Sequence, residues 1–197
     1  MRACSLAPIV FLAGCVPLEE QIEILYQEWC QTPERVTVEC VYDGDTFYIG
    51  GCSDSEAEDT IRVLGIQAPE LRGGKNGDEP ECYAEEASTF LKEFLEGQTV
   101  RIEYDVDCEG VFGRSLGWVW LEGNDLDVID LLEEYDGIGM VDDTSYEVLV
   151  NELLLRAGYA DLYDSDVANN IRYKNRIEDA HDEAKSEQAG LWAACSR

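Results

Sequence analysis

Basic residues are scarce in this chain of 197 residues, which has 14 Lys and Arg against 43 Asp and Glu and a formal net charge of −29. A protein that binds nucleic acid through its overall charge is basic, so the composition excludes that class and allows only a local binding site. No apolar run approaches the ~20 residues that span a bilayer, which excludes a polytopic membrane protein. Hydrophobic residues still make up 45% of the chain, which excludes a wholly disordered protein. We therefore expect one globular domain with small extensions.

Histidine is also scarce, because the chain has a single one, His181, and none of its cysteines form a CxxC pair. Both features argue against a zinc site. His181 lies on the polar face of a predicted helix, where we expect a solvated side chain and not a catalyst. The 8 cysteines instead favour disulfides and an oxidising compartment.

The N-terminus has the features of a secretory signal. Met1-Arg2 is followed by an apolar stretch over residues 6–13, and the tetrapeptide Leu12-Ala13-Gly14-Cys15 resembles the bacterial lipoprotein box. An ordinary signal peptide or a short buried segment would also fit this stretch. We expect residues 1–14 to be a lipoprotein signal peptide and Cys15 to be lipidated. The exported chain would then be anchored to a bacterial membrane, in the periplasm or at the cell surface.

The rest of the chain reads as a linker followed by one domain. Residues 15–34 form an anchor segment with a short amphipathic helix over residues 19–29, and residues 35–195 form the domain. An acidic insertion at about 125–143 has no clear assignment. Alternation predicts strands over residues 35–42, 46–49, 60–66, 99–104 and 115–121, and helical spacing predicts helices over 82–95, 146–157 and 170–188. This pattern predicts an α+β fold, a five-stranded OB-fold barrel with three helices in addition to the N-terminal one.

Three segments hold polar residues beside the predicted strands. They are Asp43-Gly44-Asp45-Thr46, the stretch from Arg62 to Glu70, and Phe112-Gly113-Arg114. Each is weak alone, because DGDT is a common hairpin turn and an arginine within a strand usually faces solvent. In this order and on this strand pattern they resemble the staphylococcal nuclease (thermonuclease) family, and the resemblance runs from about Val36 to Trp192.

The resemblance implies a calcium-dependent phosphodiesterase. Asp45 and the carbonyl of Ala68 would be Ca²⁺ ligands, and Glu70 would act as general base or orient the attacking water. Arg62 and Arg114 would bind the scissile phosphate and stabilise its transition state. The residue types suit this chemistry, since Arg offers a planar fork for phosphate oxygens. Hard carboxylate and carbonyl oxygens suit Ca²⁺, and a positioned carboxylate can accept a proton.

Gln67 is the one departure that matters. The family usually places a second carboxylate ligand at this position, two residues before the proline. A Gln carbonyl can bind Ca²⁺ but brings no charge, so we expect weaker metal binding and lower activity. Asp43 or the acidic loops are candidates to compensate, and the sequence does not choose between them.

Two functions therefore compete. The first is a secreted, membrane-anchored, calcium-dependent nuclease that hydrolyses DNA, RNA or both. The alternative is a catalytically weak or inactive nuclease-like barrel that acts as a binding or interaction module, which Gln67 and the acidic surface favour. Retention of Asp45, Arg62, Glu70 and Arg114 together favours the enzyme. We expect a monomer with nucleic acid as its substrate and no protein partner.

Six cysteines lie beyond residue 15, too many for spacing alone to give their pairing. In the fold implied by the resemblance, Cys82 and Cys108 flank the same cleft, so a bridge between them is predicted. The other predicted pairs are Cys30 with Cys52 and Cys40 with Cys195.

Overall fold

The computed structural model describes residues 34–195, except residues 76, 111–112, 136–137, 143 and 164–171. The predicted signal peptide, Cys15, the linker helix over residues 19–29 and Cys30 lie outside the described residues. None of the helices in the described part is long and apolar enough to cross a membrane.

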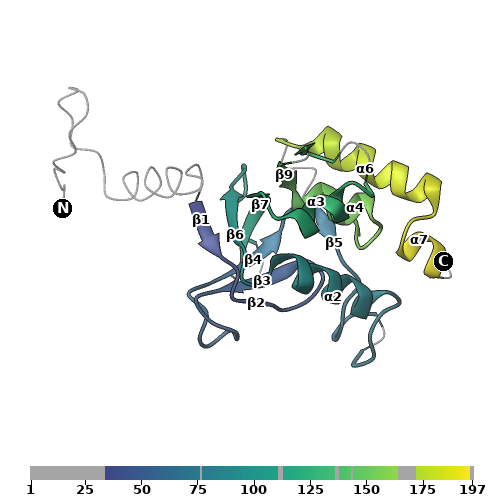
Figure 1. Cartoon of the computed structure of the whole chain (residues 1–197). Helices are drawn as coiled ribbons and strands as arrows, with labels where there is room; N and C mark the ends of the chain where they lie inside the picture. The colour runs from purple at the N-terminus through teal and green to yellow at the C-terminus, as the bar shows by residue number, and fades with distance from the viewer. Residues whose placement is uncertain are drawn as a thin grey trace, which may run out of the picture.

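An open mixed sheet forms the centre of the domain (Figure 1). Its path is β1-β6-β7-β4-β3-β2, and β9 and β8 extend it from β7. Every pairing is antiparallel except that of β4 with β7. A separate two-stranded sheet joins β5 to β10. The strands are β1 (Glu34–Thr37), β2 (Cys40–Val41), β3 (Thr46–Ile49), β4 (Asp59–Val63), β5 (Ile66–Gln67), β6 (Thr99–Glu103), β7 (Ser115–Gly123), β8 (Met140–Asp142), β9 (Ser145–Leu149) and β10 (Asp161–Leu162).

The α+β class is confirmed, but the structure does not show the predicted five-stranded closed barrel. The predicted strand over residues 35–42 breaks after β1, where the Val38 amide donates to the Gln98 carbonyl at 2.9 Å and the chain changes partner from β6 to β3. The predicted strand over residues 60–66 breaks at Gly65, whose φ of +79° is open to glycine at little steric cost. Each break converts one long strand into two short ones.

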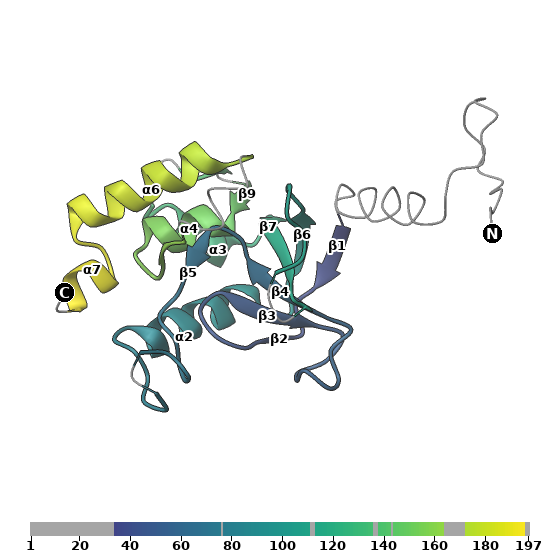
Figure 2. The same cartoon turned by 180° about the vertical axis from the view of Figure 1, so that it is seen from behind.

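Helices cover two sides of the sheet. The helices are α2 (Ala84–Leu95), α3 (Leu126–Leu132), α4 (Val150–Arg156), α6 (Lys174–Glu187) and α7 (Leu191–Ala194). Figures 1 and 2 show α2 on one side of β5 and the stacked pair α4 and α6 on the other. The predicted helix at 82–95 is confirmed as α2, which buries Ala84, Ala87, Leu91, Phe94 and Leu95 along one face.

The acidic insertion and the second predicted helix differ from expectation. Residues 125–143 contain α3 and β8, and the Asp125 carboxylate caps α3 by accepting from the Asp127 amide at 2.9 Å. The prediction of a helix from Tyr146, capped by Ser145, is wrong at its start. Residues 145–149 instead form β9, which pairs with β7; Tyr146 and Val148 are buried on either side of the half-buried Glu147.

Buried Asn151 fixes the turn that carries the candidate site. It lies on α4, fully buried, and its Oδ1 accepts from the Val119 amide of β7 at 2.9 Å. Its Nδ2 donates to the carbonyl of Leu64 at 2.7 Å. One side chain therefore ties α4 to both β7 and the turn between β4 and β5.

The disulfides differ from all three predicted pairs. The structure pairs Cys40 with Cys52 (Cα–Cα 5.3 Å) and Cys82 with Cys195 (Cα–Cα 5.8 Å). The predicted pairs Cys82–Cys108, Cys30–Cys52 and Cys40–Cys195 are therefore wrong. The hairpin of β2 and β3 brings the loop after β3 back beside Cys40, and the end of α7 lies beside the start of α2. Cys108 is also disulfide-bonded, to a partner other than Cys82.

Candidate functional site

A buried ion pair forms the centre of the predicted active site. Thr46 of β3 lies opposite Arg62 of β4, which brings Asp45 beside the arginine. Arg62 Nη1 lies 2.5 Å from Asp45 Oδ1, and the two side chains are 7% and 5% exposed. That Nη1 is buried and makes no hydrogen bond of proper geometry within the described part of the chain. The charge of this buried guanidinium is therefore balanced by the Asp45 carboxylate.

The turn at Gly65 brings the second half of the motif back onto this pair. Arg62 Nη2 donates to the Ile66 carbonyl at 3.0 Å and to Gln67 Oε1 at 2.9 Å. The Ala68 amide donates to Asp45 Oδ2 at 2.7 Å. The β4–β5 turn therefore closes around both members of the ion pair.

Gln67 connects the ion pair to Glu70. Its Nε2 donates to Glu70 Oε1 at 2.9 Å and to the Ala68 carbonyl at 3.1 Å. The structure therefore places Glu70 one side chain away from Arg62. The predicted residues Asp45, Arg62, Gln67, Ala68 and Glu70 form one hydrogen-bonded network, called the Arg62 network below.

Asp43 is a further buried acid at this site. It is 6% exposed, and its Oδ1 accepts from the Asp45 amide at 3.0 Å. Burial, and next the charge of Asp45, raise the pKa of Asp43 to about 7, although Arg62 opposes the shift. Gly44 permits the close packing, since a Cβ there would lie 2.6 Å from Ala68 Cβ. The sequence offered Asp43 only as one of several candidates to compensate for Gln67.

The ligand types at this site fit a hard cation. Asp43 and Asp45 are two buried carboxylates in adjacent positions, and their mutual repulsion is the kind that a bound cation relieves. The carbonyl of Ala68 and Oε1 of Gln67 add neutral oxygens of the kind that Ca²⁺ accepts. The described residues contain no group of three His, Cys, Asp or Glu side chains arranged around a metal position. The set fits calcium in chemistry, with a neutral amide where the family usually has a charged ligand.

Arg114 lies at an adjoining cavity. It lines, together with Thr46, a cavity of about 620 Å³ beside the β3–β4 hairpin. Thr46 Oγ1 donates to Asp45 Oδ1 at 3.0 Å, so this threonine belongs to both the cavity wall and the Arg62 network. Parallel pairing sets Ser115 of β7 beside Ile61 of β4, which puts Arg114 near the strand that carries Arg62. Asp45, Arg62 and Glu70 thus share the Arg62 network, and Arg114 lies at the adjoining cavity.

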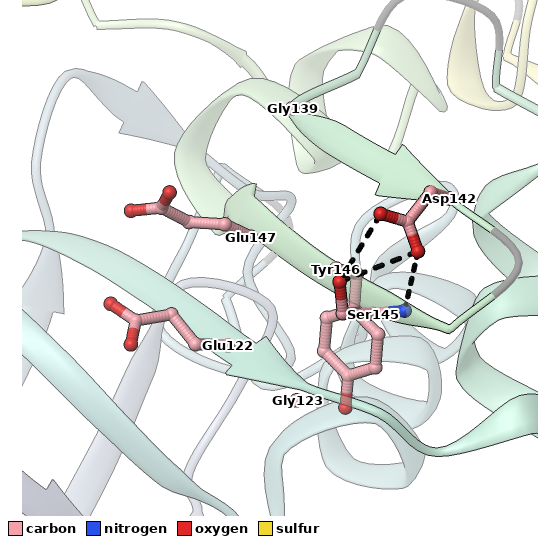
Figure 3. Close-up of a pocket in the computed structure, with 7 residues that line it drawn as sticks. All are labelled: Glu122, Gly123, Gly139, Asp142, Ser145, Tyr146 and Glu147. Carbon is pink, nitrogen blue, oxygen red and sulfur yellow. Dashed lines mark hydrogen bonds between the residues drawn. The ribbon is translucent and has the colours of Figure 1, made fainter.

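Another cavity, of about 710 Å³, lies over β7, β8 and β9 and lacks phosphate-binding groups. Figure 3 shows the carboxylates of Glu122, Asp142 and Glu147 around it. Arg101 binds Glu122 and Glu147 at 2.8 and 2.9 Å. Asp142 accepts from the Thr144 and Ser145 amides of its own turn at 2.8 and 2.9 Å. These acids stabilise the sheet and its turn, and an anionic substrate would be repelled.

Comparison with known proteins agrees with this geometry. Residues 60–194 match the family described as staphylococcal nuclease homologue. The chain belongs to the staphylococcal nuclease family. It is 30% identical over 160 residues to the thermonuclease of Staphylococcus intermedius, covering 81% of this chain and 76% of that protein. It is 29% identical over 153 residues to the thermonuclease of Staphylococcus hyicus, covering 78% of this chain and 72% of that protein.

Membership of the staphylococcal nuclease family supports a nuclease-type hydrolase at the level of the family. The matched range contains Arg62, Glu70 and Arg114. Asp45 precedes this range and enters the site through its contacts with Arg62 and Ala68. The family that the motifs indicated is thus confirmed.

The position of His181 differs from the prediction. We predicted a solvated side chain, but His181 is 9% exposed. Its Nε2 lies 2.8 Å from Asp161 Oδ1, and its ring makes an edge contact with Trp192 at 5.2 Å between centroids. The reason is that α7 folds back over α6, which single-helix periodicity does not reveal. Asp161 lies opposite Gln67 in the two-stranded sheet, so His181 supports the strand that bears the site.

Proposed function

We propose that this chain is a calcium-dependent nuclease that hydrolyses phosphodiester bonds of DNA, RNA or both. The observation that supports it best is a buried Arg62 held in one network with Asp45 and Glu70. A second arginine, Arg114, lines the adjoining cavity. An anionic phosphate would accept charge-assisted hydrogen bonds from these guanidinium groups.

The two arginines bind the scissile phosphate in this proposal. Their planar forks match two phosphate oxygens and remain charged at all working pH values. Arg62 is fixed before substrate arrives, because Asp45, Ile66 and Gln67 hold it from two sides. A pre-positioned donor stabilises the charge that develops in the transition state without reorganisation, an effect worth ~10²–10³ in rate per donor.

Glu70 accepts the proton of the attacking water or orients that water. Gln67 Nε2 donates to Glu70 Oε1 and so fixes the direction of the carboxylate. The Glu70 amide also donates to Glu81 Oε2 at 3.2 Å, which ties the Glu70 backbone to the segment that leads into α2. A general base needs both a free lone pair and a fixed position, and this arrangement supplies the position.

Asp45, the Ala68 carbonyl and Gln67 would hold the calcium ion. When bound, Ca²⁺ polarises the phosphoryl oxygen and helps to neutralise its charge. Asp43 lies within the same turn and adds negative charge close to these ligands. In this proposal the negative charge of Asp43 compensates for the carboxylate that the family usually has at position 67.

The proposal includes export and anchoring through a lipid on Cys15, with the chain acting as a monomer. The net charge of −29 opposes capture of a polyanion, so binding depends on the local arginines and on salt, which screens repulsion beyond about 10 Å. Cys15→Ser should convert a membrane-bound protein into a soluble or unprocessed one. Cell fractionation in which the wild type is fully soluble would contradict the anchor and leave the nuclease proposal intact.

A nuclease assay tests the main proposal against its alternative. The chain lacking residues 1–14 is incubated with single- and double-stranded DNA and with RNA, in Ca²⁺ or in excess chelator. The nuclease proposal predicts hydrolysis that requires Ca²⁺. Binding of the same oligonucleotides without hydrolysis would instead favour the non-catalytic binding module, which the neutral Gln67 and the acidic surface support.

A further inference from the structure

The cavity beside Arg114 has a composition unlike that of the Arg62 network. We call it the hairpin cavity and define it by Tyr42, Tyr48, Asp54, Glu58, Asp59 and Arg114, which line it together with Thr46 and its neighbours. Among the described residues of the lining, Arg114 is the one basic side chain, and two tyrosines and three acids line the same cavity. A cavity for phosphate alone would be basic throughout, so this lining points to a different part of a substrate.

The walls of the hairpin cavity are fixed by the fold. The disulfide between Cys40 and Cys52 joins β2 to the loop after β3. Tyr48 donates from its hydroxyl to Asp54 Oδ1 at 2.9 Å. Asp59 accepts from the Ser115 hydroxyl at 2.8 Å. These contacts give the cavity its shape before any ligand binds, which lowers the entropy cost of binding.

Tyr42 is the exposed aromatic residue of the cavity lining. It is 57% exposed, although it directly precedes the buried Asp43. Its ring makes an edge contact with Tyr48 at 5.9 Å between centroids and 77° between planes. The Tyr42 amide donates to the Thr46 carbonyl at 2.9 Å, so the backbone of this tyrosine is fixed to the wall shared with the Arg62 network. Exposed rings beside a phosphate-binding arginine are the usual platform on which nucleobases stack.

The three acids of the hairpin cavity favour some chemical groups over others. Asp54, Glu58 and Asp59 repel a second phosphate but accept hydrogen bonds from amino groups, as carboxylates do from cytosine N4. Adenine and guanine also carry amino donors, whereas thymine and uracil do not. A neutral base with an amino group could both stack on the Tyr42 ring and donate a hydrogen bond to the acids.

We propose that the hairpin cavity is a nucleobase subsite, with Tyr42 as its stacking platform and its acids favouring bases that carry an amino group. The base belongs to the nucleoside next to the phosphate held at Arg114. This inference rests on the proposed nuclease function and adds the part of the substrate that the Arg62 network does not contact.

Dinucleoside monophosphates test the subsite, because each has a single scissile bond. The reference substrate carries cytosine on both sides, and two others replace one nucleoside or the other with an abasic deoxyribose. Wild type, Tyr42→Ala, Tyr42→Phe and the control Leu126→Ala are compared in Ca²⁺. Leu126 is 64% exposed on α3 and lies outside the lining of the cavity.

Tyr42→Ala should lower kcat/KM on the cytosine substrate about tenfold, mainly through KM, whereas Tyr42→Phe and Leu126→Ala should match the wild type. On one of the two abasic substrates, wild type and Tyr42→Ala should be equal, which also identifies the side that enters the cavity. Equal rates for wild type and Tyr42→Ala on every substrate would overturn the subsite, as would an equal loss on all three.

The acids have a separate test in the ratio of rates for cytosine and thymine at the side so identified. Glu58→Gln should lower this ratio several-fold. Removing a negative charge should raise the rates for both substrates by a similar factor, and that factor cancels in the ratio. A ratio of one in the wild type would overturn the role of the acids. Absence of any hydrolysis by the wild type would instead contradict the proposed nuclease function and the subsite with it.

Discussion

Two clusters in this molecule each place an arginine on a strand among carboxylates, and they serve different ends. Arg62 is 7% exposed and has one acidic partner, Asp45, with a backbone carbonyl and a neutral amide as its other contacts. Arg101 is 19% exposed and binds Glu103, Glu122 and Glu147. The first arginine is buried with one carboxylate in contact, and the second is partly exposed and contacts three.

The pKa values follow the same division. The pKa of Asp43, beside the Arg62 network, is raised to about 7 by burial and by Asp45. The pKa of Glu122 is lowered because Arg35 and Arg101 donate hydrogen bonds to it. Arg101 joins β6, β7 and β9 and lies 5.1 Å from the Trp120 ring, which is the environment of a structural cation. The arginine proposed to be catalytic is thus the one that lies beside an acid with a raised pKa, a feature of functional sites.

Replacing each arginine with lysine should separate the two roles most strongly. Arg62→Lys keeps the charge but loses the fork that contacts both Asp45 and Gln67, so we expect kcat to fall ~10²–10³. Arg101→Lys should leave kcat within about twofold of the wild type, since it touches no proposed substrate. Steady-state kinetics with Ca²⁺ measures both, and circular dichroism checks that both variants are folded. Equal losses of kcat in the two variants would contradict the assignment of a catalytic role to Arg62 and a structural role to Arg101.

Asp43→Asn should stabilise the metal-free protein at alkaline pH. A carboxyl with a folded pKa near 7 and an ordinary unfolded pKa is protonated in the native state between pH 4 and 7. The wild type should therefore lose stability as pH rises through this range and change little above it. The variant should be more stable by up to about 4 kcal/mol at pH 8, with the difference vanishing near pH 4.

Urea unfolding in chelator across pH 4 to 8 measures this difference. Glu122→Gln is the matched control, because the pKa of Glu122 is shifted in the opposite direction. A constant difference between wild type and Asp43→Asn at all pH values would contradict the buried, proton-binding state of Asp43.

Arg101→Met should lower stability while leaving catalysis intact. Its loss leaves three glutamates without their shared partner, two of them partly exposed, and we expect a cost of about 2 kcal/mol in unfolding free energy. The thermal midpoint should fall with kcat/KM unchanged at a temperature where the variant is folded. A variant as stable as the wild type would show that the cluster contributes little beyond solvated charge pairs.

Gln67→Asp is the mildest change and sharpens the account of the Arg62 network. It restores a charged ligand, so Ca²⁺ should bind about tenfold tighter. The same change removes the Nε2 donor from Glu70, so the gain in kcat should be smaller than the gain in calcium affinity. Calcium titration by calorimetry measures the affinity, and Gln98→Asp serves as a control away from the site. Unchanged affinity would show that position 67 is not a calcium ligand.

The sequence predicted local features better than long-range ones. The helix at 82–95 and the chemistry of Asp45, Arg62 and Glu70 follow from short motifs whose residues lie close in sequence or on paired strands. The disulfide between Cys82 and Cys195 could not be predicted, because it depends on how α7 returns to α2 across a separation of 113 residues. The resemblance placed Cys82 and Cys108 at one cleft, which gave the wrong pair. No local sequence pattern shows that the C-terminal helix brings Cys195 to Cys82.

The remaining errors share a cause. His181 is buried by Trp192 of a neighbouring helix, and its own helical face gives no sign of that cover. Residues 145–149 carry period-two burial that a helical reading of the leucines beyond it obscured. Gln67 stood out in the sequence as a departure from the family motif, but its position between Arg62 and Glu70 could not be predicted. That position depends on the Gly65 turn and on Asn151, which only tertiary packing fixes.

The central claim is that the Arg62 network is catalytic, and Glu70→Gln tests it most directly. The substitution keeps the size of the side chain and removes the base. The measurement is kcat/KM for DNA and RNA in Ca²⁺, with thermal unfolding as the check on folding. We predict a Ca²⁺-dependent rate in the wild type that falls ~10²–10³ in Glu70→Gln at an unchanged thermal midpoint. Equal rates in the two proteins, or a wild-type rate that persists in chelator, would contradict the account.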